Sequence, residues 1–146
     1  MTETEMVLDC YYKLTSSNRF KRIVLEVPYL SRCIDMVLVD RDDKIISIEF
    51  KLKNWKKAIE QAQDHKLGVD KAYICMPDNK RECSEAMYNS LVNSGVGLFG
   101  YDPLNTIPII EKVPAQLITD HWKPYVESLK NKIEIINEIQ KKETLA

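Results

Sequence analysis

Residues 32–52, RCIDMVLVDRDDKIISIEFKL, contain the feature that decides the fold and points to a function. Asp35 and the triplet Glu49, Phe50 and Lys51 lie in runs of Ile, Val, Leu and Met that otherwise have the composition of buried strands. Charged side chains are costly to bury unless they are paired, and such positions gather at functional sites. The stretch therefore predicts two β-strands that carry a charged site.

The spacing of these two strands predicts which side chains meet. If Asp40 pairs with Lys44 across the turn, Asp35 stands directly opposite Glu49. Side chains alternate between the two faces of a strand, so Glu49 and Lys51 share one face. Two carboxylates opposite each other repel, and a cation between them is the natural compensation. Hard oxygen ligands favour Mg²⁺ or Mn²⁺ as that cation.

Hydrophobic periodicity divides the remainder of the chain into helices and strands. A strand, helix, strand connection between residues 49 and 76 implies a parallel crossover beside an antiparallel meander. We therefore expect one α/β domain with a mixed β-sheet flanked by helices. The expected elements are a helix over 4–15, strands over 21–27, 33–39 and 44–52, a helix over 54–68, a strand over 71–77, a helix over 78–93 and strands over 95–102 and 105–112.

The first two helices have predicted faces and ends. Asn54 is a good N-cap for the second helix, and Gly68 can close that helix in a left-handed C-cap. The first helix is amphipathic, with an apolar stripe predicted to consist of Val7, Leu8, Tyr11 and Leu14.

The charged pattern resembles that of the PD-(D/E)xK nuclease superfamily, in which one strand carries an acid and the next carries D/E-x-K. Asp35 and Glu49-Phe50-Lys51 match this motif, and residues 3–77 follow the αβββαβ order of the family core. Ile34 stands where the motif usually has a proline. The resemblance implies a restriction-endonuclease-like or Holliday-junction-resolvase-like core and a nuclease activity.

The resemblance also implies roles for individual residues. Asp35 and Glu49 would bind a divalent ion, Mg²⁺ or Mn²⁺, with the Phe50 carbonyl as a further ligand. Lys51 would position or activate the attacking water and stabilise developing charge. Each of these roles is carried over from the family to the matching position in this chain.

Many family members carry an acid on the first helix and a glutamine on the helix after the third strand. Glu5 is the preferred match for the acid, with Glu3 as competitor, and Gln61 matches the glutamine. Gln61 and His65 are four residues apart and are therefore neighbours on one helix face. Either could contact a phosphate or orient a site residue. We interpret His65 as a surface or supporting residue, because no His or Cys stands at metal-ligand spacing from it.

Composition sets broad limits. The chain has 146 residues, 45% of them apolar, which suffices for one domain with a hydrophobic core. No apolar run approaches 18 residues and the N-terminus is acidic, so we expect neither a membrane span nor a secretory signal, and a cytoplasmic location. The four cysteines lack CxxC spacing, and Cys33 and Cys75 fall in predicted strands, so we interpret both as reduced core thiols.

The C-terminal segment, 121–146, is expected to be a long helix that follows a nuclease-like domain over 1–120. Its apolar residues have a heptad-like 4-3-4-3 spacing that fades at Gln140. Such a helix needs a partner surface, either on its own domain or on a second copy of the chain in a homodimer. The residues of this seam are Trp122, Val126, Leu129, Ile133 and Ile136.

The net charge of −1 means that any basic surface must be local. One cluster has two open interpretations: a basic lip that holds phosphates, or a solvated helix start. The cluster consists of Arg32, Lys51, Lys53, Lys56 and Lys57.

The sequence therefore supports a leading hypothesis and an alternative from another class. The first is a Mg²⁺-dependent endonuclease that acts on nucleic acid, with DNA as the expected substrate, through Asp35, Glu49 and Lys51. The alternative is a module that kept the nuclease fold without catalysis and serves in nucleic-acid binding or oligomerisation. Fold alone does not choose between them, because function resides in the site.

Overall fold

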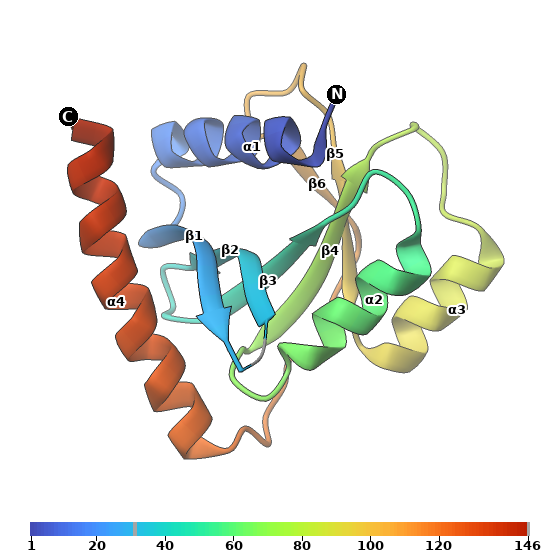
Figure 1. The fold of residues 1–146 in the computed structure, drawn as a ribbon. Helices are drawn as coiled ribbons and strands as arrows, with labels where there is room; N and C mark the ends of the chain where they lie inside the picture. Colours follow the sequence, from blue (N-terminus) through green and yellow to red (C-terminus); the bar gives the residue numbers. More distant parts are fainter. Residues whose placement is uncertain (31, 146) are drawn as a thin grey trace.

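A six-stranded mixed sheet with the order β1-β2-β3-β4-β5-β6 forms the centre of the molecule (Figure 1). The structure is a computed structural model that describes residues 1–30 and 32–145. Its elements are α1 (Glu3–Ser17), β1 (Arg22–Tyr29), β2 (Arg32–Val39), β3 (Ile45–Phe50), α2 (Trp55–Asp64), β4 (Lys71–Pro77), α3 (Glu85–Ser94), β5 (Gly97–Tyr101), β6 (Ile109–Val113) and α4 (Lys123–Leu145).

The sheet topology confirms the predicted α/β fold. Strands β1, β2 and β3 form an antiparallel meander, and β3 pairs in parallel with β4 through the crossover helix α2. Strand β5 is parallel to β4, and β6 closes the sheet in antiparallel pairing. The carboxyl ends of three neighbouring parallel strands, β3, β4 and β5, therefore meet at one edge.

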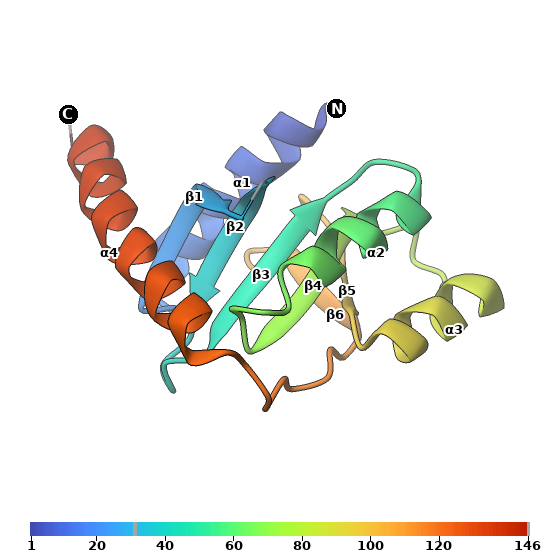
Figure 2. The same ribbon diagram turned by 60° about the horizontal axis from the view of Figure 1, so that its bottom comes forward.

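Helices cover both faces of the sheet, so the molecule has two hydrophobic cores (Figures 1 and 2). Helix α1 forms one core with the inward residues of β2, β3 and β4. Helices α2, α3 and α4 form the other, on the opposite face. Cys75 lies in the α1 core as expected, whereas Cys33 is exposed.

Helix α1 confirms part of its predicted stripe, since Leu14 is buried and Val7 and Tyr11 are partly buried against the core. Its fully buried residues are Met6, Cys10 and Leu14, which recur at four-residue spacing. The predicted Leu8 is instead 39% exposed. The prediction weighted the large aliphatic side chain over Met and Cys, whereas the contact with the sheet selects residues by their angular position on the helix.

Helix α2 begins where predicted and ends earlier. The Asn54 side chain accepts a hydrogen bond from the Lys57 N–H, so the predicted N-cap is confirmed. The predicted C-cap at Gly68 is wrong, because the helix ends at Asp64 with His65 as C-cap in a right-handed conformation. Gly68 has another role: a Cβ atom there would lie 2.6 Å from the Tyr29 hydroxyl oxygen, so only glycine admits this close approach.

Helix α3 starts seven residues later than predicted, at Glu85, with Ser84 as its N-cap. Residues 78–84 form a loop instead. Two side chains within that loop bind nearby backbone N–H groups, Asp78 that of Lys80 and Asn79 that of Arg81. Such local hydrogen bonds compete with helix formation and explain the late start.

Helix α4 packs against β1 of its own chain, with Leu129 and Ile133 buried in the core. Trp122, the first residue of the predicted seam, is 56% exposed. Where the seam becomes polar, the Gln140 side chain donates to the Leu25 carbonyl and accepts from the Leu25 N–H, at 2.8 and 2.9 Å. This pair of bonds occupies backbone groups of an edge strand. No helix within residues 1–30 and 32–145 has both the length and the apolar character needed to cross a membrane.

Candidate active site

The hairpin of β2 and β3 has the predicted register. Met36 pairs with Ile48, and the Asp40 N–H donates to the Lys44 carbonyl, as the turn requires. Continuing that register places Asp35 opposite Glu49, and the two carboxyl groups are in hydrogen-bonding contact. The two acids therefore point to the same side and meet.

The regular ladder stops at this point. Asp35 Oδ2 accepts a hydrogen bond of 2.8 Å from the Phe50 N–H, so a side chain takes the place of the next backbone acceptor. Because the N–H and C=O of one strand residue point the same way, the Phe50 carbonyl also points towards β2. The Phe50 ring is buried on the other face, in the α1 core. The predicted ligand role of the Phe50 carbonyl stays a prediction.

The neighbouring strand β1 is irregular at the same level. Glu26, the residue across from Asp35 in the β1–β2 register, has a φ of 50°, in the left-handed region. A non-glycine residue there costs on the order of 1 kcal/mol. The alternation of side chains along β2 also breaks at this point. Ile34 and Met36 are two residues apart and would share one face of a regular strand, but Ile34 lies in the core under α2, α3 and α4, and Met36 lies in the α1 core. The strands thus separate around Asp35 and leave room beside it.

The carboxyl pair has an unusual electrostatic state. Burial, and then the charge of Asp35, raise the pKa of Glu49 to about 8. Burial also raises the pKa of Asp35, while the hydrogen bond from Phe50 opposes that rise. The Lys51 ammonium lowers the pKa of both. At neutral pH without a metal, Glu49 is therefore protonated and donates to Asp35.

These residues fit a divalent ion of the magnesium type. Glu49 Oε2 is buried and has no hydrogen-bond partner among the described residues, which is costly unless the atom has a ligand. Within the described residues no group of three or more His, Cys, Asp or Glu side chains is placed to hold a metal. Mg²⁺ needs fewer protein ligands than that, since it is commonly bound by one or two carboxylates, water and substrate phosphates.

Glu3, rather than Glu5, is the acid that α1 brings to this site. Glu3 Oε2 accepts from the Leu52 N–H at 3.1 Å, and its charge raises the pKa of Asp35. Glu3, Glu26 and Asp35 line a cavity of about 190 Å³. Glu5 lies two residues, and so about 200°, further around the helix, and it is exposed. Glu26 is a site residue that the sequence analysis missed, and nothing in its local sequence marks it.

Gln61 lies on α2, and His65, the C-cap of that helix, lies beside Glu49. The Gln61 Oε1 atom is buried without a hydrogen-bond partner. His65 is only 1% exposed, so of its two predicted roles the surface role is wrong, and the supporting role stays a prediction. Its Nε2 atom lies 3.8 Å from Glu49 Oε2, and within the part of the chain that the structure describes neither ring nitrogen has a hydrogen-bond partner. Burial lowers the pKa of His65 to about 4, so the ring is neutral.

Exposed cations follow Lys51 along the chain. Lys53, Lys56 and Lys57 are exposed at the start of α2, which both the basic-lip and the solvated-helix interpretations require. Arg32 forms an ion pair of 3.0 Å with Asp64, so part of its charge is already compensated. The positive charge of this lip therefore comes chiefly from the lysines.

Comparison with known proteins supports the fold. The chain matches no protein-family model and no curated protein. Its structure is similar to SPO1766, a protein of unknown function from Silicibacter pomeroyi, with a TM-score of 0.69 and 14% identity over 99% of this chain and 92% of that chain. A repair endonuclease from Pyrococcus abyssi aligns with a TM-score of 0.49 and 20% identity over 70% of this chain and 48% of that chain. The first similarity shows the fold, and an activity must be argued from the site residues.

Proposed function

We propose that this protein is a metal-dependent nuclease that hydrolyses phosphodiester bonds in DNA, with Asp35, Glu49 and Lys51 as its catalytic residues. The observation that carries the proposal is the contact between the buried Glu49 carboxyl group and the half-buried Asp35 carboxyl group, with the Lys51 ammonium close enough to lower the pKa of both. A fold selected for stability alone gains nothing from two adjacent acids that are shielded from water, because desolvation and mutual repulsion both oppose their ionisation. Perturbed acids in contact are typical of functional sites.

The chain's own residues account for most of the proposed chemistry. Asp35 is held in one orientation by the Phe50 N–H, and Glu49 presents a buried oxygen without a partner. A bound Mg²⁺ would neutralise a phosphate oxygen and lower the pKa of a coordinated water. Lys51 places a positive charge where negative charge develops on the phosphate, and it can orient the attacking water. Glu3 and Gln61 are proposed to position these groups.

Substrate binding is proposed to use the basic lip. Lys53, Lys56 and Lys57 follow Lys51 and are free to contact phosphates on either side of the cleaved bond. Contacts of this kind position a nucleic acid without reading its sequence.

A cleavage assay tests the proposal. Protein freed of metal with EDTA is given Mg²⁺ or Mn²⁺ and labelled DNA or RNA in single-stranded, duplex and branched forms. We expect metal-dependent cleavage that falls at least 100-fold in Glu49→Gln and in Asp35→Asn. The matched control is Glu127→Gln, which changes an exposed acid on α4 and should retain full activity. Binding of DNA without cleavage in either metal would contradict the proposal and favour the noncatalytic module.

A further inference from the structure

A second cavity, of about 200 Å³, opens at the carboxyl ends of β4 and β5. It lies close to the candidate active site, because Phe50 pairs with Cys75 and the next two residues of β4 line the cavity. Its walls are mostly apolar and come from the start of α2, the strand ends and the start of α3. The apolar lining residues are Trp55, Met76, Cys83, Met87 and Leu98.

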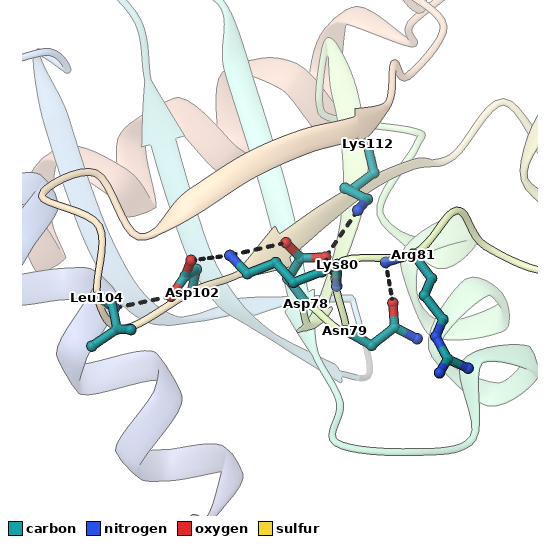
Figure 3. Close-up of polar contacts among 7 residues, drawn as sticks. All are labelled: Asp78, Asn79, Lys80, Arg81, Asp102, Leu104 and Lys112. Carbon is teal, nitrogen blue, oxygen red and sulfur yellow. Dashed lines mark hydrogen bonds and ion pairs between the residues drawn. The ribbon is translucent and has the colours of Figure 1, made fainter.

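The loop that forms the rim, 78–84, is held in place by ion pairs (Figure 3). Asp78 Oδ1 accepts from Lys112 Nζ at 2.9 Å and from the Lys80 N–H at 3.1 Å. The Lys80 ammonium also binds Asp102. A Cβ atom on Gly100 would lie 3.0 Å from the Asp78 Cβ, so glycine lets Asp78 sit close against β5. The rim is therefore fixed before any ligand arrives.

These ion pairs leave one cation of the loop uncompensated. The hydrogen bond from Lys112 holds the pKa of Asp78 below its usual range, and Lys80 does the same for Asp102, so both acids are ionised and paired. Arg81 is different: its backbone N–H is held by Asn79, but its guanidinium has no ion-pair partner within the described chain. Figure 3 shows that side chain pointing away from the ion pairs.

An aromatic ring also lines the cavity, and a cation lies over it. Trp55 is partly buried and packs against the α2–α4 core, which limits its rotation. Lys56 Nζ lies 5.6 Å from the centroid of the Trp55 ring. An aromatic platform flanked by lysine and arginine is the arrangement with which proteins hold an unpaired base and its neighbouring phosphates.

We propose that this cavity binds one unpaired nucleobase of a single-stranded nucleic acid, which takes the place of the Lys56 ammonium over the Trp55 ring, while Lys56 and Arg81 contact the flanking phosphates. The inference rests on the proposed function and narrows its substrate class to nucleic acid with a single-stranded segment. A paired base cannot offer its face to the Trp55 ring, because its neighbours in the stack already cover it. Glu82, also on the rim, repels phosphate and so directs the strand over Lys56 and Arg81.

The two tryptophans of the chain allow a direct test. Fluorescence of the Glu49→Gln protein is followed in EDTA during titration with single-stranded oligothymidylate, so binding is measured without cleavage. In the Trp122→Phe background only Trp55 reports, and we expect its emission to be quenched. Trp55→Ala should weaken binding about tenfold. Trp122→Phe alone, the matched control, should change the affinity less than twofold, because Trp122 is exposed at the start of α4.

Arg81→Ala provides a second variant on an exposed loop residue, in case Trp55→Ala does not fold. It should reduce the slope of log affinity against log salt by about 0.7, the value of one phosphate contact on a single strand. Unchanged affinity and salt slope in both variants would overturn the inference, as would equal affinity for a duplex of the same length. Cleavage by the natural protein without Trp55 quenching would retain the nuclease proposal and reject base binding in this cavity. Quenching without cleavage would support base binding in the cavity and reject the nuclease proposal.

Discussion

Glu49 is a carboxylic acid that the fold holds away from water and against a second carboxyl group. Its pKa of about 8 means that the metal-free protein keeps most of this group neutral at pH 7. Binding a divalent ion would require the proton to leave, so metal affinity should rise with pH. The same shift has a consequence for stability.

Glu49→Gln should stabilise the metal-free protein at high pH. The carboxyl group titrates near 8 in the folded chain and near 4.5 in the unfolded chain, so its favourable contribution is complete below pH 4.5 and is lost as the pH rises through 8. Glutamine cannot ionise and avoids that loss. In urea unfolding with EDTA, we expect the variant to exceed the natural protein by on the order of 2 kcal/mol at pH 8.5. The difference should shrink at pH 5, and a difference independent of pH would contradict the assigned ionisation.

His65 is proposed to position Glu49. Its Nε2 atom and Glu49 Oε2 are both buried without hydrogen-bond partners at a separation of 3.8 Å, which one bridging water or a small rotation would satisfy. Loss of such a supporting group typically costs 10- to 100-fold in metal affinity. We expect His65→Phe to weaken Mn²⁺ binding, measured by electron paramagnetic resonance, at least tenfold. His65→Gln, which keeps a donor, should recover most of the affinity, and equal losses in the two variants would indicate a packing role only.

At the scale of elements, most strands and the start of α2 were predictable, whereas the end of α2, the start of α3 and the exact buried face of α1 were not. Strand β6 begins four residues later than predicted, at Ile109 instead of residue 105. Alternating residues and a short polar turn fix the register of β2 and β3, so local sequence suffices for the meeting of Asp35 and Glu49. The buried face of α1 depends on tertiary contacts with β1, β2 and β3, which local sequence does not determine. The role of Gly68, in the loop between α2 and β4, likewise depends on Tyr29 at the end of β1.

Helix α4 should contribute to the stability of a single chain. Leu129 is fully buried against the sheet, so Leu129→Ala is expected to lower the free energy of unfolding by about 2–5 kcal/mol. Ile135→Ala, on the same helix at a position that is 63% exposed, should change it by less than about 0.5 kcal/mol. Urea unfolding at two protein concentrations tests this. A midpoint that rises with concentration would show that α4 docks on a second copy instead.

At the scale of the whole molecule, the site is assembled from parts that are distant in the sequence. The β2–β3 hairpin supplies the two acids, α1 brings Glu3 to the backbone N–H of Leu52, and α2 places His65 beside Glu49. The motif predicts the first of these contributions because the acids are local to one hairpin. The choice of Glu3 over Glu5 depends on the rotation of α1 on the sheet, which only tertiary packing sets. Glu26 lines the cavity next to Asp35 at a point where its own backbone has a positive φ, and its residue type does not predict that conformation.

The central claim is that Asp35 and Glu49 together hold one divalent ion beside Lys51. Crystals soaked in Mn²⁺ at a pH above 8, where Glu49 can ionise, would be measured for anomalous scattering at a wavelength sensitive to manganese. The account predicts one strong peak within coordinating distance of an oxygen from each carboxylate, and its loss in Glu49→Gln crystals. A map with no peak between the two acids at saturating Mn²⁺, or with the ion bound elsewhere, would contradict it.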